Sequence, residues 1–265
     1  MRKNIVIFGS GNLATHLAIA LKNANHNITQ IYSRNIRNAV SLSKKVNCSF
    51  TDNLRAINKT ADIYFIAVSD MAISDVLQNI DLKDKLLVHT SGSTNIDIFN
   101  GITNNYGAFY PLQTFNKNWE VKFREIPLCI EANNKLSEVL LLSIANQLSD
   151  NVVLIDSEKR LQLHLAAVFV SNFVNHFYAI ADKLVGEKDI SFDLLKPLIL
   201  KTSQNALDYK PVDCQTGPAI RNDRNIIELH SDLLKKFPLY KRIYIFVSKS
   251  IFYFHRREKG NNEKF

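Results

Sequence analysis

The first half of the chain alternates short apolar runs with amphipathic stretches. The apolar run 4–8 ends at Gly9, and apolar positions spaced for one face of a helix follow over 12–24. Such runs are typical of buried strands, and the 3.6-residue spacing is typical of helices. Further strands are predicted at 28–32, 62–68, 86–89, 106–109, 127–131 and 152–155, and further helices at 71–79 and 134–148. Strands that alternate with helices predict βαβ units and a mainly parallel sheet.

The pattern changes near Asp156. From Ser157 onward we expect no strand, and long helical patterns run over 157–185, 191–209, 222–235 and 238–256. A length of 265 residues suits two domains. We therefore predict an α/β domain over 1–156, followed by an all-α domain over 157–265 that ends in a basic tail.

The net charge of +8 is concentrated at the C-terminal end. Residues 235–265 contain nine Lys or Arg and two Glu, so this segment carries +7 and the first 234 residues carry +1. Such a segment could bind nucleic acid or an anionic membrane. No nucleic-acid motif accompanies the charge. We favour a solvated helix face with a basic tail, and expect neither nucleic acid nor a membrane surface as partner.

The cysteines and apolar runs narrow the class of protein further. Cys48, Cys129 and Cys214 are isolated and lack metal-ligand spacing, which fits a reducing compartment and predicts no metal site. The apolar runs are shorter than the roughly 18–20 residues of a membrane span. The four apolar residues of 5–8 are fewer than the about 7–15 of a secretory signal. We expect a cytoplasmic protein.

A glycine-rich turn lies directly between the first predicted strand and helix. Its sequence, Gly9-Ser10-Gly11-Asn12-Leu13-Ala14, has the GxGxxA pattern. The first glycine permits a tight turn, the second lets a pyrophosphate approach the backbone, and the small third residue lets helix and strand pack closely. The helix N-terminus then offers N–H groups to the phosphates. The pattern predicts a dinucleotide-binding domain of Rossmann type, although a tight turn without a ligand would use the same glycines.

The end of the second predicted strand bears on which dinucleotide binds. An NAD site usually has Asp or Glu about 20 residues after the glycines, where it bonds the ribose hydroxyls. This chain has Ser33 and Arg34 there instead, and a hydroxyl with a cation suits a 2′-phosphate. We therefore favour NADP(H) over NAD(H). The alternative is that Arg34 is an ordinary surface residue.

Two further segments follow strands directly. Ligands of open α/β sheets lie beyond the carboxyl ends of the strands. We therefore expect Val68-Ser69-Asp70 and Thr90-Ser91-Gly92-Ser93 beside the cofactor. The GxSxG pattern of a nucleophilic serine does not surround Ser91. We expect Ser91 to line the site and not to attack the substrate.

The predicted helix 157–185 carries its polar residues in one stripe. Two adjoining rows form at 100° per residue: His164, Ser171, Asn175 and Asp182, and then Asn172, His176 and Lys183. We expect a mostly buried helix whose stripe faces a cleft or a partner helix. His164 is a candidate general acid or base, because histidine side chains titrate near neutral pH. An ordinary helix–helix contact is the alternative.

The chain resembles known families at these residues. The glycine turn, Ser33-Arg34 and Ala67-Val68-Ser69-Asp70 resemble the NADP-binding domain of the superfamily of pyrroline-5-carboxylate reductase, ketopantoate reductase and the 6-phosphogluconate and β-hydroxyacid dehydrogenases. More narrowly, the chain resembles a bacterial family of Rossmann-like oxidoreductases with a helical C-terminal domain of unknown function. The segments that carry this second resemblance are 89–93, 110–115, 164–173 and 215–223.

The resemblance implies a nicotinamide-dependent reductase or dehydrogenase that dimerises through its helical domain. Dehydrogenase relatives place Lys near the start of the long helix and Asn one or two turns later, and here His164 and Asn172 stand at those places. We expect a small carbonyl, imine or hydroxy substrate between the domains. In that site His164 would be the acid or base, Asn172 would orient the substrate and Ser91 would line the cleft. Because His replaces Lys, the alternative is an NADP(H)-binding sensor or regulatory protein without turnover.

Overall fold

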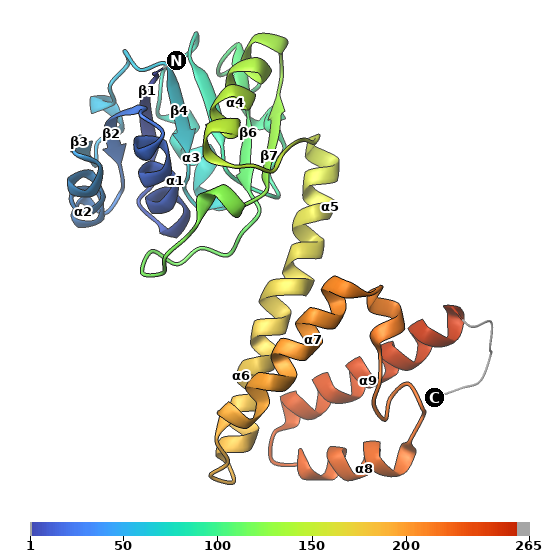
Figure 1. The fold of residues 1–265 in the computed structure, drawn as a ribbon. Coiled ribbons are helices and arrows are strands. Elements are labelled where there is room, and N and C mark those ends of the chain that lie inside the picture. Colours follow the sequence, from blue (N-terminus) through green and yellow to red (C-terminus); the bar gives the residue numbers. More distant parts are fainter. Residues whose placement is uncertain (1, 259–265) are drawn as a thin grey trace. The chain divides into compact units, whose positions relative to one another are not determined.

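The computed structural model describes residues 2–258 (Figure 1). The chain divides into two compact units between Phe173 and Val174. The expected boundary at residue 156 lies earlier, at the start of helix α5 (Ser157–Ala167). The last seven residues of the predicted basic tail, 259–265, lie outside the described residues.

The first unit is built on an eight-stranded sheet with the order β3-β2-β1-β4-β5-β6-β7-β8. Strands β1 to β6 run parallel to one another, β7 pairs antiparallel with β6, and β8 pairs parallel with β7. The mainly parallel sheet is confirmed. The strands are β1 (Asn4–Phe8), β2 (Asn27–Tyr32), β3 (Ser49–Thr51), β4 (Ile63–Ile66), β5 (Leu86–His89), β6 (Asn105–Pro111), β7 (Leu128–Ala132) and β8 (Val152–Leu154).

Helices cover both faces of this sheet (Figure 1). Successive strand residues point to opposite faces, so Ile5 and Ile7 of β1 pack in one core cluster and Val6 and Phe8 in the other. The first cluster also takes side chains from α1 (Asn12–Asn23), α2 (Ile36–Val46) and α4 (Lys135–Leu148). The second takes side chains from α3 (Asp70–Gln78) and the 3₁₀ segment Ile96–Phe99. Helix α2 and strand β3 are additions to the expected elements.

The second unit contains helices and loops and no strand among its described residues, which confirms the all-α prediction. Its helices are α6 (Val174–Gly186), α7 (Lys196–Asp208), α8 (Arg224–Leu233) and α9 (Pro238–Glu258). Helix α6 continues the long helix that begins with α5, and a π-helical segment, Val168–Phe173, joins the two.

The long helix Ser157–Gly186 differs from expectation in its exposure. None of its most apolar 18-residue window is buried, so the prediction of a mostly buried helix is wrong for the single chain. Among the residues the structure describes, this helix alone is long and apolar enough to cross a membrane by length and composition. One such helix is a weak indication of a membrane span.

Candidate functional site

The glycine turn leaves open space above the start of α1. Gly9 has φ = +123°, and a Cβ there would lie 2.1 Å from the carbonyl oxygen of Ala67, so only glycine fits this position. A Cβ on Gly11 would have no atom within 4 Å. The open space at Gly11 is therefore the place where a ligand can reach the backbone.

Helix α1 begins without a side-chain cap. Gly11 is the N-cap residue, no side chain accepts a hydrogen bond from the first amides, and the first turn contains no acidic residue. The N–H groups of a first helical turn have no partner within the helix, and they bind anions well. The geometry at this turn fits the pyrophosphate of a dinucleotide.

A cavity of about 360 Å³ adjoins the turn, which we call the glycine-loop cavity. The Ser10 hydroxyl donates to the Ser33 hydroxyl at 2.8 Å, so the glycine turn and the end of β2 are joined directly. Arg34 is exposed beside them. The acid that lines this cavity, Asp75, comes from α3 and not from the end of β2. The predicted cofactor residues in its lining are Gly9, Ser10, Gly11, Ser33, Arg34, Val68 and Ser69.

The other predicted cofactor residues lie nearby with different contacts. Asn12 accepts a hydrogen bond from the Lys117 amide at 3.1 Å through its side-chain oxygen. Thr90 is buried, and its amide donates to the Ile66 carbonyl at 3.3 Å. Leu13 lines a second cavity. Asp70 accepts a hydrogen bond from the Ser93 hydroxyl, which joins the segments after β4 and β5.

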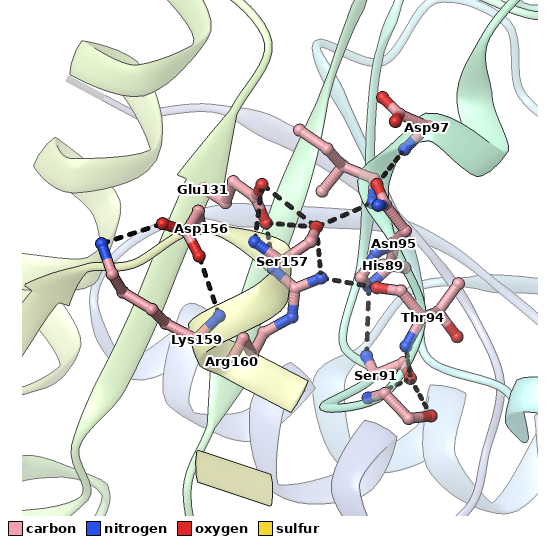
Figure 2. Close-up of polar contacts among 12 residues, drawn as sticks. His89, Ser91, Thr94, Asn95, Asp97, Glu131, Asp156, Ser157, Lys159 and Arg160 are labelled. Atoms are coloured by element: carbon pink, nitrogen blue, oxygen red, sulfur yellow. Dashed lines mark hydrogen bonds and ion pairs between the residues drawn. The ribbon is translucent and has the colours of Figure 1, made fainter. Parts of the chain in front are cut away.

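The Ser91 hydroxyl is engaged within its own loop (Figure 2). It accepts from the amides of Ser93 at 3.1 Å and Thr94 at 3.0 Å. The Ser91 amide in turn donates to Nδ1 of His89 at 3.2 Å. Burial, and then the charge of Arg160, lower the pKa of His89 to about 3, so this ring is neutral. These bonds fix the shape of the loop that carries Gly92.

The second cavity has a volume of about 580 Å³, and we call it the His164 cavity. The end of β6 and the loop after it form one wall, and the long helix forms the other. His164 and Asn172, the two candidates on the helix, both line it, whereas Ser91 does not. The lining residues are Leu13, Tyr110, Pro111, Leu112, Gln113, Thr114, Leu163, His164, Ala166, Ala167, Val168, Val170, Ser171 and Asn172.

Tyr110 forms a pair with His164 inside this cavity. Its hydroxyl oxygen lies 3.0 Å from Nδ1 of His164, and the two rings meet edge to face at 77°. A Cβ on Gly92 would lie 2.7 Å from that nitrogen and 2.8 Å from Cζ of Tyr110, so glycine is required for the pair to pack here. Burial, with smaller effects from Cys129 and Asp70, raises the pKa of Tyr110 to about 12. The phenol therefore keeps its proton at neutral pH.

Tyr110 is a site residue that the sequence reasoning missed. The segment 110–115 carried the family resemblance, but nothing in its pattern connected Tyr110 with a histidine 54 positions later. The only available signal was its place at the end of a predicted strand.

A buried ion pair holds the start of α5 (Figure 2). The Arg160 guanidinium, whose side chain is 1% exposed, contacts the Glu131 carboxylate of β7 and donates to the Thr94 carbonyl. Ser157 also donates to Glu131 through its hydroxyl at 2.8 Å. Because His164 stands one turn after Arg160, this anchor also sets the position of His164.

Three of the predicted polar residues of the long helix line the His164 cavity. His164 and Ser171 belong to the first expected row and Asn172 to the adjoining row, and the last two lie within the π-helical segment. Ser171 also bonds Thr114 of the opposite wall, with 2.7 Å between the hydroxyl oxygens. Within the described residues, no group of three or more His, Cys, Asp or Glu could hold a metal ion.

Comparisons with known proteins identify two family profiles in the chain. Residues 4–92 match the family described as NADP oxidoreductase coenzyme F420-dependent, and residues 126–251 match a domain of unknown function, DUF2520. No curated protein matches the sequence.

Solved structures extend this likeness over nearly the whole chain. A Bacteroides fragilis protein provisionally assigned as an NADP oxidoreductase is 42% identical, with a TM-score of 0.91 over 95% of this chain and 98% of its own. A Thermotoga maritima protein is 24% identical, with a TM-score of 0.73 over 92% of this chain and 97% of its own. An imine reductase from Myxococcus stipitatus in complex with NADP+ is 18% identical, with a TM-score of 0.62 over 96% of this chain and 93% of its own. The last two show a shared fold.

Proposed function

We propose that this chain is an NADP(H)-dependent oxidoreductase that acts on a small carbonyl, imine or hydroxy compound. The premise is its family: the chain belongs with the Bacteroides fragilis protein to a family of Rossmann-like oxidoreductases that have a helical C-terminal domain of unknown function. One observation carries the proposal. Gly11 lines the glycine-loop cavity and Leu13 lines the His164 cavity, so the first turn of α1 borders both. These residues are about 3 Å apart along the helix axis. A dinucleotide on the glycine turn would extend its nicotinamide toward His164.

The cofactor contacts follow from the chemistry of the cavity. The uncapped amides of α1 would bind the pyrophosphate. Ser33 and Arg34 would bind the 2′-phosphate, since a hydroxyl and a guanidinium both donate to phosphate oxygens. A relative of the same fold, the imine reductase, holds NADP+ in its solved structure. These features favour NADP(H) over NAD(H).

His164 would transfer the proton of the reaction. Nδ1 of His164 bonds the Tyr110 hydroxyl, which leaves Nε2 to contact the substrate. A hydroxyl can either donate to Nδ1 or accept from it, so this bond persists in both charge states of the ring. NADPH, when bound, supplies the hydride. The imidazolium form of His164 would give its Nε2 proton to the carbonyl oxygen or imine nitrogen of the reduced substrate, which would leave a neutral imidazole and an alcohol or amine.

The remaining candidates take supporting roles. Asn172 lines the His164 cavity and would orient the substrate by its amide. Ser91 is bound to backbone amides of its own loop, so it would act by holding Gly92 against the Tyr110–His164 pair. Tyr110 would fix the orientation of the imidazole. The NADP(H) sensor without turnover remains the alternative function.

Two measurements test the proposal. Fluorescence titration should show tighter binding of NADPH than of NADH, and Arg34→Ala should weaken NADPH binding by about 10-fold, or 1.4 kcal/mol, while leaving NADH binding unchanged. Arg37→Ala is the matched control, because Arg37 lies outside the cavity lining. NADPH oxidation with a panel of small ketones and cyclic imines should then be abolished by His164→Ala. Tight NADPH binding without turnover of any panel member would favour the sensor instead.

We further propose a homodimer that forms through the helical unit. Large apolar side chains of this unit are exposed, among them Leu198, Leu207 and Phe246, and exposed apolar surface of this kind often marks an interface. Light scattering should give twice the chain mass, and Leu207→Arg should shift it toward one chain. Leu136→Arg, at an exposed position of α4 in the first unit, is the control. A monomeric native protein would contradict this assembly. We expect the dimer in the cytoplasm, which cell fractionation would check.

A further inference from the structure

We infer that the His164 cavity takes a substrate without an anionic group: a ketone or aldehyde, or an imine, on an apolar body. This inference rests on the proposed function and narrows its substrate class. Among the fourteen residues that line the cavity there is no Lys, Arg, Asp or Glu. Most contribute alkyl surface, and the polar remainder consists of hydroxyls, two amides, the Tyr110 phenol and the His164 ring.

The lining has no partner for a carboxylate or phosphate. Transfer of an unpaired anion from water into an apolar site is costly, and proteins that recognise carboxylates usually provide a guanidinium or ammonium group. Two hydroxyls of this lining, those of Thr114 and Ser171, already bond each other at 2.7 Å. The amides of Gln113 and Asn172 can hydrogen-bond a neutral group without a charge.

The charge of Arg160, which lies near this cavity, is already paired with the carboxylate of Glu131. The positive charge of Arg160 acts on Tyr110, whose side chain lines the cavity. Its guanidinium is buried and contacts the Glu131 carboxylate, the Thr94 carbonyl and the Ser157 hydroxyl. An incoming carboxylate would have to compete with Glu131 for it, inside the protein. Arg160 is therefore an anchor for α5 and no receptor for an anionic substrate.

The negative charge of Asp70 also affects the His164 cavity, because it acts on Tyr110 in the cavity lining. Asp70 bonds the Ser93 hydroxyl beside Gly92, and its negative charge contributes to the raised pKa of Tyr110. A charge that disfavours the phenolate at Tyr110 also disfavours a bound carboxylate there. The same charge favours the positive charge that forms on an imine nitrogen as His164 protonates it. The electrostatics of the cavity thus disfavour anionic substrates.

Matched substrate pairs test this inference on the whole protein with saturating NADPH. One pair is 1-pyrroline and 1-pyrroline-5-carboxylate, and the second is cyclohexanone and 4-oxocyclohexane carboxylate. We expect kcat/KM to be about 100-fold higher for the member without a carboxylate, as follows from a loss of roughly 2.7 kcal/mol for an unpaired charge. Equal or faster turnover of the acids would overturn the inference and leave the oxidoreductase intact. NADPH binding with no turnover of any member would refute the proposed function, and the inference with it.

A variant that adds a cation provides the second test. Val170 lines the cavity and is 75% exposed, so Val170→Lys should fold normally. The variant should shift the ratio of kcat/KM within each pair toward the acid by at least about 10-fold. Val139→Lys, at an exposed position of α4, is the matched control and should leave the ratio unchanged. An unchanged ratio in Val170→Lys would show that charge in this cavity does not select the substrate, and would overturn the inference.

Discussion

The hydroxyl oxygen of Tyr110 lies 3.0 Å from Nδ1 of His164, although the two residues are 54 positions apart in the chain. Tyr110 belongs to the end of a strand and His164 to the second turn of a helix. The rings meet edge to face, 5.9 Å between centroids. The pair therefore depends on the alignment of β6 with α5, which the Arg160–Glu131 contact maintains.

Removal of the Tyr110 hydroxyl should impair the chemical step selectively. Tyr110→Phe keeps the ring and its packing, and loses the hydrogen bond to the imidazole. We expect kcat to fall by about 10-fold to 100-fold, because a hydrogen bond to a charged group is worth about 1.5–3 kcal/mol. The NADPH dissociation constant should not change. Tyr106→Phe is the control, since the Tyr106 hydroxyl bonds Asn100 outside the cavity. A Tyr110→Phe enzyme with native kcat would rule out this role.

Gly92→Ala should separate the Tyr110–His164 pair. The added methyl group would lie 2.7–2.8 Å from atoms of both rings, so at least one ring must move. We expect kcat/KM to fall about 100-fold, since small displacements of catalytic groups have effects of this size. Gly186→Ala adds a methyl group with no atom within 4 Å, so it should leave kcat/KM unchanged. Steady-state kinetics would measure kcat/KM for both variants, and NADPH binding would show whether each variant still binds the cofactor. A native kcat/KM in Gly92→Ala would contradict the prediction.

The two glycines of the turn should fail in different ways. Gly9→Ala combines a positive φ with a 2.1 Å clash, so it should cost at least about 1–3 kcal/mol of unfolding free energy and abolish NADPH binding. Gly11→Ala has room for its methyl group, so stability should stay within about 0.5 kcal/mol of native. The same methyl group would occupy the space of the pyrophosphate, and NADPH affinity should fall at least about 10-fold. Normal NADPH binding by Gly11→Ala would place the nucleotide elsewhere.

Loss of one partner of the Arg160–Glu131 ion pair should lower the unfolding free energy more than replacement of both partners by apolar residues. Glu131→Gln leaves the buried charge of Arg160 without its partner, which should lower the unfolding free energy by about 3–5 kcal/mol. Replacement of both partners, by Glu131→Leu with Arg160→Met, should be less destabilising than the single change. Urea unfolding measures both. Asp81→Asn breaks the exposed pair with Lys59 and should cause no measurable loss.

The buried His89 should make the fold sensitive to acid. Its pKa is lowered to about 3 in the folded protein, against 6.5 in the unfolded chain, so only the unfolded state binds this proton between those values. Stability should therefore fall as pH drops below 6.5, by about 1.4 kcal/mol per unit, or about 2 kcal/mol at pH 5.

A substitution at His89 isolates this contribution. His89→Asn keeps an acceptor for the Ser91 amide and removes the titrating ring, so unfolding free energies at pH 5 and 7.5 should differ less than in the native protein. Burial also lowers the pKa of His26, but this effect is common to both proteins and cancels. The exposed His176→Asn should retain the native pH dependence. An identical pH dependence in His89→Asn would contradict the prediction.

Local periodicity predicted most of the first unit, because its strands are short apolar runs bounded by turns. Helix α2 was not predicted, although its buried positions Ala39, Leu42, Ser43 and Val46 have the spacing of an amphipathic helix. Strand β3 has three residues, which is too short for an alternating pattern to register. The exposure of the long helix was also beyond reach, since an apolar sequence does not reveal whether its partner belongs to the same chain.

The candidate site was predictable only where chemistry is local. The glycine turn and Ser33-Arg34 are recognisable because their function depends on residues adjacent in sequence. The Tyr110–His164 pair depends on a strand and a helix that meet in space, which no local pattern in the sequence indicates. Arginine side chains are mostly exposed, and nothing in the sequence around Arg160 indicates otherwise. In the structure, however, Arg160 is fully buried against Glu131.

The shared first turn of α1 constrains how this protein can evolve or be redesigned. Because Gly11 and Leu13 border different cavities from the same turn, a substitution that moves this turn changes nucleotide affinity and substrate fit together. Residues of the segment 168–172 line the His164 cavity and do not line the glycine-loop cavity. New substrate preferences will therefore arise by variation in that wall, while the beginning of α1 drifts little, and a library aimed at altered selectivity is best confined to Val168, Val170 and Asn172.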